Sequence, residues 1–289
     1  MAWPRPLAAL GLTLALLGPA PAAGESGEEA LLVDALTKLG EARLDDALSS
    51  IQRLVSQRPN FRLAQLVYGD LLLAKAGAAT GFGALAGAGE TAPRDLDGLR
   101  LEARKRLDGH LDRLPADAVP ESVLALAPGH SHLLAVDLAK SRLHVLENRD
   151  GRLRRRSDHY VSIGKNGMGK EREGDGRTPV GVYFVSGFLH DERLPELYGA
   201  GAFPIDYPNP WDRRQGRTGY GIWIHGVPRD TYSRPPLASD GCVTLSNADF
   251  QVLRPLLEAT ERPPVVLADR LEWVSGEDAT AADVGLEAA

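Results

Sequence analysis

The chain has 289 residues, of which 43% are hydrophobic and 25% are charged, and its formal net charge is −6 at pH 7. This apolar content is sufficient for a folded core, and the length accommodates one large domain or two ordinary ones. The negative charge argues against a nucleic-acid partner, because binding to phosphates favours a basic stripe.

The first 23 residues have the pattern of a secretory signal peptide. Arg5 precedes the apolar run LAALGLTLALLG, and Ala20 and Ala22 supply the small residues of a cleavage site. The run is short for a bilayer span, so an uncleaved anchor is the weaker alternative. We therefore expect an exported protein without a transmembrane segment after removal of residues 1–23.

Residues 25–115 form a predicted all-helical region. Apolar residues recur three and four positions apart between Leu32 and Val55, and Gly40 and Pro59-Asn60 mark helix ends. The pattern resembles a tetratricopeptide-like hairpin, with about one and a half of the roughly three units that such repeats need. Two interpretations stay open: a small bundle packed on its neighbour, or a module that docks another protein.

The rest of this first half consists of a loop, a helix and a linker. The Gly/Ala-rich segment 77–95 predicts a flexible loop, LDGLRLEARKRLDGHLDRLP predicts one more amphipathic helix, and residues 115–129 predict a linker.

Residues 130–272 have the sequence pattern of a β-dominated domain. Short alternating runs are separated by Gly/Pro turns, among them HLLAVD, VGVYFVSGFL, GIWIHGV, CVTLS, PVVLAD and LEWV. One helix, NADFQVLRPLLEAT, interrupts them, with Ser246 or Asn247 as its N-cap. The acidic, Ala-rich tail 275–289 predicts disorder. The expected fold class is α+β, a β-dominated domain preceded by a small helical region.

Cys242 is the only cysteine of the chain. A secreted domain stapled by disulfides has an even number of cysteines, so this thiol forms an intermolecular bridge, is buried and inert, or is a nucleophile. His225 closes one predicted strand, and Cys242 opens another 242 − 225 = 17 positions later. If these strands are neighbours, the histidine can take the thiol proton, or stay charged and lower the pKa of the thiol.

The backbone around these two residues suggests further parts of an acyl-transfer site. Gly241 permits a sharp turn, and the amides of Gly241 and Cys242 are candidates for binding a tetrahedral oxyanion. A histidine base also needs an acceptor on its second nitrogen. No Asp or Asn stands in an obvious place, so a backbone carbonyl near Gly226 is the candidate.

These residues form a recognisable pattern. A His-Gly pair is followed at the family's spacing by Ser-x-Gly-Cys, and upstream Thr178, Pro179, Gly181 and Tyr183 form a Thr-Pro-x-Gly-x-Tyr segment. Over residues 130–272 the chain resembles the L,D-transpeptidase catalytic domain family, YkuD. The resemblance implies a periplasmic or cell-surface enzyme that acts on peptidoglycan, and we expect a periplasmic enzyme without metal or cofactor.

The resemblance also implies roles for individual residues. Cys242 is the nucleophile, His225 the base, and Gly226 the source of the orienting carbonyl, while Ser239 and Gly241 occupy the family's Ser and Gly positions. By the same resemblance, the cysteine attacks an L,D peptide bond of a stem tetrapeptide, beside meso-diaminopimelate and before a terminal D-Ala. The acyl-enzyme then passes to an amine of another stem peptide or of a lipoprotein lysine. The helical region is a further candidate for protein binding.

Asp240 departs from the pattern, because most family members have His there. A carboxylate near the thiol disfavours the thiolate unless a cation offsets it, and protonated His225, Arg234 or a substrate amine is the candidate. Alternatively, Asp240 caps a turn and faces away.

The Ser-Asp-Gly-Cys sequence resembles the YafK-type branch, which includes a hydrolase that releases a wall-attached lipoprotein. Water as acceptor, in an L,D-carboxypeptidase or amidase, is therefore the first alternative, and a non-catalytic cell-wall scaffold is the second.

The remaining candidates concern substrate binding. Residues 231–236, TYSRPP, predict a lid, in which Arg234 either clamps a substrate carboxylate or is merely solvated. The candidate substrate-binding residues are Ser239, Asp240, Arg234, Tyr232 and Thr178. Tyr207 and Trp211 either line a substrate groove or pack under a loop.

Cofactor and metal sites are not expected. Lys165, Lys170 and Arg177 lie in a Gly-rich loop that lacks the phosphate-binding motif. His130, His132 and His190 lack metal-ligand spacing with any further ligand, which argues against a zinc peptidase.

Overall fold

The computed structural model describes residues 27–78, 81–83, 92–112, 114–115, 117–123, 126–127 and 129–275. The predicted signal peptide and all but the first residue of the predicted tail lie outside the described residues, as does most of the predicted loop 77–95. Across the described part of the chain, no helix is long and apolar enough to cross a membrane.

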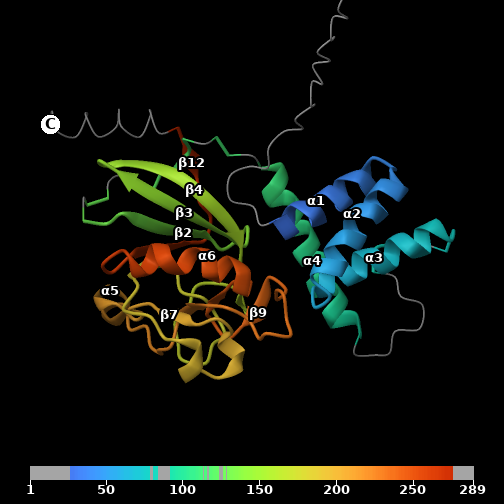
Figure 1. Ribbon diagram of the computed structural model, residues 1–289. Coiled ribbons are helices and arrows are strands. Elements are labelled where there is room, and N and C mark those ends of the chain that lie inside the picture. Colours follow the sequence, from blue (N-terminus) through green and yellow to red (C-terminus); the bar gives the residue numbers. More distant parts are fainter. Residues whose placement is uncertain are drawn as a thin grey trace, which may run out of the picture.

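Four helices form one side of the molecule (Figure 1): α1 (Gly27–Gly40), α2 (Leu44–Gln57), α3 (Arg62–Lys75) and α4 (Ala92–Leu111). Their buried core includes Leu32, Ile51, Phe61 and Leu71. As the sequence predicts, α1 ends at Gly40 and a Pro-Asn turn separates α2 from α3. In contrast to the prediction, α4 begins inside the Gly/Ala-rich segment. A proline in a first helical turn costs no hydrogen bond, so Pro93 does not prevent this start.

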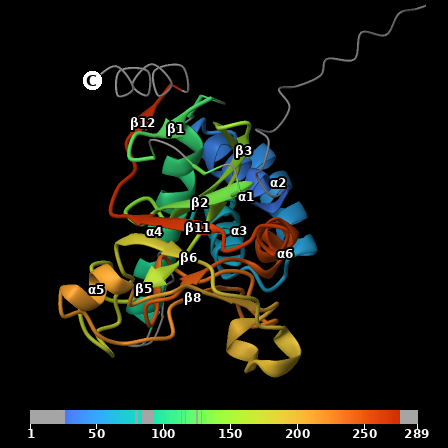
Figure 2. The ribbon, with the colours of Figure 1, turned by 90° about the vertical axis from the view of Figure 1, so that its left-hand side faces the viewer.

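A five-stranded mixed sheet forms the centre of the second half (Figure 2). Its order is β4 (Arg152–Tyr160), β3 (Arg142–Arg149), β2 (His132–Asp137), β11 (Pro264–Ala268) and β6 (Gly181–Phe184). Only the β2–β11 pair is parallel. Leu143 and Val145 belong to the main core and Leu146 to a cluster on the other face. The sheet is therefore covered on both faces.

A smaller sheet contains His225, and Cys242 directly precedes one of its strands. It consists of β10 (Val243–Thr244), β8 (Trp223–His225) and β7 (Ala202–Pro204), and α6 (Asn247–Glu258) packs between it and the central sheet. Phe203, Ile224, Phe250 and Leu253 share this core. Ser246 is the N-cap, and its hydroxyl accepts a hydrogen bond from the Asp249 amide. The α+β architecture is as predicted.

The shortest elements escape sequence prediction because two or three residues show no alternation. Two such pairs are β5 (Ile163–Gly164) with β9 (Leu237–Ser239), and β1 (Val119–Pro120) with β12 (Trp273–Val274). β1 lies in the segment predicted as a linker. It is ordered because Val119 is buried with Leu133 and Leu271 on the outer face of the sheet. The chain also contains α5 (Pro210–Arg214), η1 (Asp191–Arg193) and η2 (Glu196–Tyr198).

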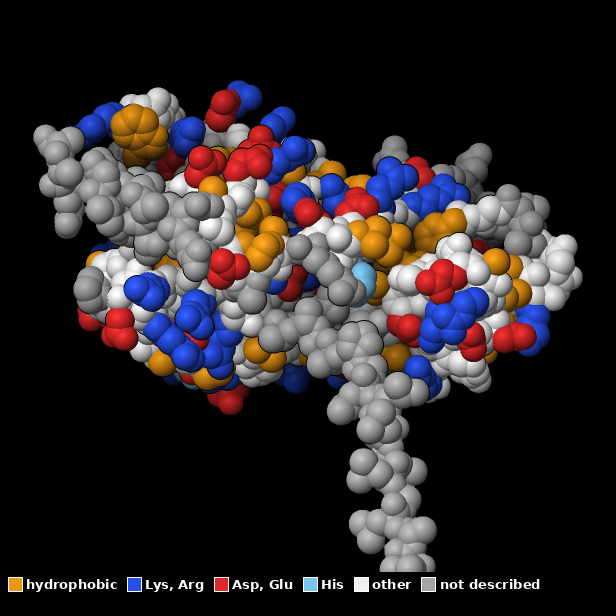
Figure 3. Space-filling view, turned by 90° about the horizontal axis from the view of Figure 1, so that it is seen from above, with side chains coloured by type: hydrophobic (Ala, Val, Ile, Leu, Met, Phe, Trp, Pro, Cys, Tyr) orange, Lys and Arg blue, Asp and Glu red, His pale blue; other side chains and the backbone are white. Residues whose placement is uncertain are grey.

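The surface seen from above carries both signs of charge (Figure 3). Lys/Arg and Asp/Glu side chains are interspersed there with hydrophobic ones. This face therefore does not present a single field of one sign.

Candidate active site

Strand pairing brings Cys242 and His225 together. β8 and β10 are parallel neighbours, with Ile224 opposite Val243 and His225 opposite Thr244. Residues two apart along a strand share a face. Cys242 directly precedes β10 and therefore lies on the same face as Thr244 and His225, one step along the neighbouring strand.

Two side chains from other elements reach both members of this pair. The Tyr198 ring meets the His225 imidazole edge-on, with ring centroids 4.9 Å apart, and the Tyr198 hydroxyl interacts electrostatically with Cys242. Arg234 interacts electrostatically with both Cys242 and His225. Four groups from η2, β8, the following loop and the start of β10 thus converge.

A backbone carbonyl fixes the tautomer of His225. Its Nδ1 lies 2.6 Å from the Gly226 oxygen. Because a carbonyl only accepts, Nδ1 must carry the proton, and Nε2 of the neutral ring is left as an acceptor. The orienting group is therefore the one expected near Gly226.

Asn247, the first residue of α6, holds the turn that supplies this carbonyl. Its Oδ1 accepts hydrogen bonds from the Ala200 amide (2.9 Å) and the Val227 amide (3.2 Å), and its Nδ2 donates to the Val227 oxygen (2.7 Å). A Cβ atom at Gly226 would lie 2.2 Å from Asn247 Oδ1. The close approach of helix and turn therefore requires glycine at position 226.

Two hydroxyl side chains hold the turn before Cys242. The Ser239 hydroxyl donates to the Cys242 oxygen (2.6 Å) and accepts from the Gly241 amide (3.1 Å). The Thr178 hydroxyl donates to the Gly241 oxygen (2.9 Å). Gly241 has φ +128°, and a Cβ atom there would lie 2.7 Å from the Arg177 oxygen. These contacts give Ser239 and Thr178 a part in shaping the loop around Cys242.

One expectation about the oxyanion site needs correction. The Gly241 amide already donates to the Ser239 hydroxyl and is therefore not free to bind an oxyanion. Of the two predicted donors, only the Cys242 amide remains a candidate.

The thiol and the imidazole rest as neutral groups. The half-buried Cys242 thiol donates to the Gly221 oxygen at 3.4 Å. Burial raises the pKa of this thiol to about 11, and nearby Asp240 adds to the rise. Burial lowers the pKa of His225 to about 4, and nearby Arg234 lowers it further. Of the two predicted roles for His225, accepting the proton fits these values better than a standing imidazolium.

Asp240 has a partner that the sequence does not suggest. Its carboxylate is 87% exposed and lies 2.7 Å from Lys165 Nζ, which is 58% exposed. The Lys165 amide donates to the Ser239 oxygen, and this contact brings the lysine to the turn. Arg234, one of the predicted offsetting cations, lowers the pKa of the thiol, and Lys165 pairs with Asp240 in addition. Ion pairs as exposed as this one contribute little energy.

The other predicted substrate residues divide into two groups. Arg234 is half-buried near the thiol. Tyr232, in contrast, is only 6% exposed and its ring packs on Phe61 in the helical core. Tyr207 is buried, with its hydroxyl donating to the Thr218 oxygen, whereas Trp211 on α5 is exposed.

The charged residues of the Gly-rich loop serve local contacts. Lys170 is buried and pairs with Asp175 at 2.8 Å, and Arg177 donates to the Met168 oxygen. Sequence analysis missed Tyr198 and the contacts of Asn247. Tyr198 lies far from both sequence motifs, so no local signal marks it.

The fold and the site define a domain of the cysteine–histidine type, with the imidazole on β8 and the thiol directly before the parallel neighbouring strand β10. Residues 131–267 match the model of the L,D-transpeptidase catalytic domain, YkuD. Comparison with curated protein sequences gave no match.

Two solved structures are similar to part of this chain. Bd1075 from Bdellovibrio bacteriovorus is 28% identical over 59% of this chain and 60% of its own, with a TM-score of 0.50. The helical cell shape determining protein Pgp2 from Campylobacter jejuni is 26% identical over 54% of each chain, with a TM-score of 0.46. The similarity thus spans about three fifths of the length of Bd1075.

Proposed function

We propose that the protein is a periplasmic, cysteine-dependent L,D-transpeptidase that acts on peptidoglycan stem peptides. The observation that carries the proposal is the 2.6 Å contact of His225 Nδ1 with the Gly226 oxygen. It leaves Nε2 as a proton acceptor on the strand face that Cys242 shares.

The proposed chemistry proceeds in two acyl transfers. Cys242 Sγ attacks the carbonyl carbon of the scissile peptide bond while its proton moves to His225 Nε2. The tetrahedral intermediate places its oxyanion at the Cys242 amide. Collapse breaks the C–N bond, the leaving amine takes the proton from His225, and an acyl-thioester remains. An acceptor amine then attacks the thioester, gives its proton to His225, and releases the thiol.

Because the Cys242 thiol and the His225 imidazole are both neutral at rest, the thiol proton has to move during the reaction. With the pKa of the thiol near 11 and that of the imidazole near 4, a preformed thiolate–imidazolium pair is disfavoured. The proton therefore leaves Sγ as the bond to carbon forms, which is general-base catalysis.

Mass spectrometry of muropeptides tests the proposal. Wild-type protein and Cys242→Ala are incubated with peptidoglycan sacculi, and His225→Gln tests the base. New 3→3 cross-links, or D-Ala release with amine exchange, seen with the wild type alone, are the expected result. Loss of a cross-link or of an attached lipoprotein, with water added, would identify a hydrolase instead. Identical products from wild type and Cys242→Ala would contradict catalysis by this residue.

A further inference from the structure

The loop between His225 and β9 is attached to the helical region. The Tyr232 ring packs at a tilt of 32° against the ring of Phe61, which directly precedes α3, with centroids 4.2 Å apart. The Tyr232 amide donates to the Asn60 oxygen (3.4 Å), and the Asn60 side chain donates to the Arg229 oxygen (3.3 Å). This loop, residues 226–236, thus extends from the candidate active site to the helices.

The residues beside Arg234 are held at three further points. The Ser233 hydroxyl donates to Glu102 on α4 at 2.7 Å, and the Tyr160 hydroxyl donates to the Arg234 oxygen at 3.0 Å. Pro235 packs so closely on α4 that a Cβ atom at Gly98 would lie 3.1 Å from its ring. The backbone at Arg234 is therefore fixed from both sides.

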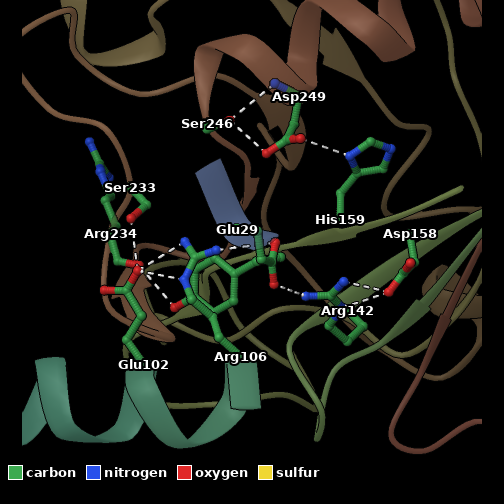
Figure 4. A network of polar contacts seen from close by, with 11 residues as sticks. Glu29, Glu102, Arg106, Arg142, Asp158, His159, Ser233, Arg234, Ser246 and Asp249 are labelled. Carbon is green, nitrogen blue, oxygen red and sulfur yellow. Dashed lines mark hydrogen bonds and ion pairs between the residues drawn. The ribbon is translucent and has the colours of Figure 1, made fainter. Parts of the chain in front are cut away.

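A buried ionic network supports these contacts (Figure 4). Arg106 on α4 pairs with Glu102 at 3.0 Å and with Glu29 on α1 at 3.3 Å, and its guanidinium lies 3.8 Å from the centre of the Tyr160 ring. Arg142 on β3 pairs with Glu29 at 2.5 Å. Buried pairs of this kind fix geometry, since a misplaced partner leaves an uncompensated charge.

The guanidinium of Arg234 is left available on the active-site side. Among the described residues, no hydrogen bond or ion pair engages it, although it interacts electrostatically with Cys242 and Asp240. Arginine presents a planar fork of donors that matches a carboxylate. A fixed backbone and an unengaged guanidinium near the thiol are the features of a binding residue.

We propose that Arg234 binds a carboxylate of the acyl-donor peptide beside Cys242, and that the helical region holds Arg234 in place through Tyr232, Ser233 and Pro235. The proposal rests on the function proposed above and gives the helices a part in substrate recognition. Ser233 and Glu102 are positioning residues, because they act through Arg234. The carboxylate belongs either to the terminal D-Ala or to the diaminopimelate side chain.

Kinetics with modified donors tests the binding role. Three stem tetrapeptides are compared: one with free carboxylates, one amidated at the terminal D-Ala, and one amidated at the diaminopimelate side chain. Arg234→Gln should raise KM for the free donor by about tenfold or more, as expected for a charge-assisted pair. It should change KM little for the one donor that lacks the recognised carboxylate. Arg229→Gln, which removes an exposed arginine from the same loop, is the matched control. Equal KM values for Arg234→Gln and wild type with all three donors would overturn the binding role.

A second set of variants tests the positioning role. Ser233→Ala should raise KM about three- to tenfold with a smaller change in kcat. Ser233→Thr should have the KM of the wild type, because the hydroxyl remains. Thr231→Ala removes a hydroxyl whose one side-chain partner among the described residues is neighbouring Asp230, and it should leave KM unchanged. Wild-type kinetics for Ser233→Ala alongside an impaired Arg234→Gln would overturn the positioning by the helices.

A binding measurement separates failure of this inference from failure of the proposed function. If the wild type turns over none of the donors, the affinity of Cys242→Ala for the free tetrapeptide is measured with and without Arg234→Gln. Weaker binding in the double variant would support the carboxylate site although the proposed reaction fails. Absent or unchanged binding would overturn the site as well.

Discussion

At the scale of single residues, the charges around Cys242 set its reactivity. Asp240 raises the pKa of the thiol, and Arg234 lowers it, both on top of the larger effect of burial. Because only the thiolate attacks, the raised pKa reduces the reactive fraction at neutral pH. The proposed mechanism therefore requires His225 to take the proton during attack.

This balance predicts the pH dependence of thiol alkylation. With a pKa of about 11, Cys242 should react with iodoacetamide about tenfold or more slowly than free cysteine at pH 7.5. The rate should still rise at pH 10, where free cysteine has reached its plateau. Mass spectrometry of the alkylated protein from pH 6 to 11 measures this.

Two variants check which charges are responsible. Asp240→Asn should lower the pKa of the thiol and shift the profile to lower pH, whereas Arg234→Gln should shift it to higher pH. Asp230→Asn, in the exposed part of the loop, is the control. A plateau below pH 8 in the wild type would show that a stable thiolate exists and would contradict the neutral resting pair.

At the scale of elements, the start of α6 positions the turn that orients His225. Asn247 joins three backbone groups from two segments, the Ala200 amide and both polar groups of Val227. Such a cluster ties catalytic geometry to helix packing, because the turn cannot move without leaving these groups unpaired.

Replacing this asparagine should affect both stability and rate. Asn247→Ala leaves the three backbone groups without their partner, and we expect the free energy of unfolding to fall by about 2 kcal/mol. Urea denaturation measures this, and kcat should fall because the Gly226 carbonyl no longer holds the imidazole. Asn209→Ala, at the N-cap of exposed α5, should lower stability by about 1 kcal/mol and leave kcat unchanged. An Asn247→Ala enzyme with wild-type kcat would contradict the positioning of His225 by α6.

The local sequence pattern predicts most of the helices and strands, and it also predicts Cys242 and His225 as site residues. The strands at β2, β8 and β11 follow from short apolar runs between turns, and Cys242 stands out as the only thiol. The hydrogen bond between Ser233 and Glu102 spans 131 positions, and no periodicity indicates it. Buried Arg106 and Arg142 are equally hidden, since arginine is ordinarily exposed. The parts of the site that depend on contact between the two halves therefore escape sequence analysis.

At the scale of the whole molecule, the buried network joins the two halves of the chain. Glu29 lies on α1, yet it pairs with Arg106 on α4 and with Arg142 on β3. Lys105 on α4 also donates to the Ala139 oxygen, close to β3. We expect such shared polar contacts to make the helical region and the catalytic domain unfold together.

Removal of the shared carboxylate tests this coupling. In Glu29→Ala, Arg106 retains Glu102 and Arg142 retains Asp158, but each loses one buried partner. We expect a loss of about 3 kcal/mol, the lower end of the range for broken buried pairs. Asp45→Ala is the matched control, because the Asp45–Lys75 pair is exposed and contributes less than about 1 kcal/mol.

Two probes report on the two halves during urea unfolding. Circular dichroism at 222 nm follows the helices, while fluorescence follows Trp211, Trp223 and Trp273, which all lie in the second half. The two curves should coincide in the wild type and separate in Glu29→Ala, with the helical signal lost first because the smaller core is left alone. Curves that are already separate in the wild type would show that the network does not couple the halves. The loop carrying Arg234 would then have a support that melts independently of the catalytic domain.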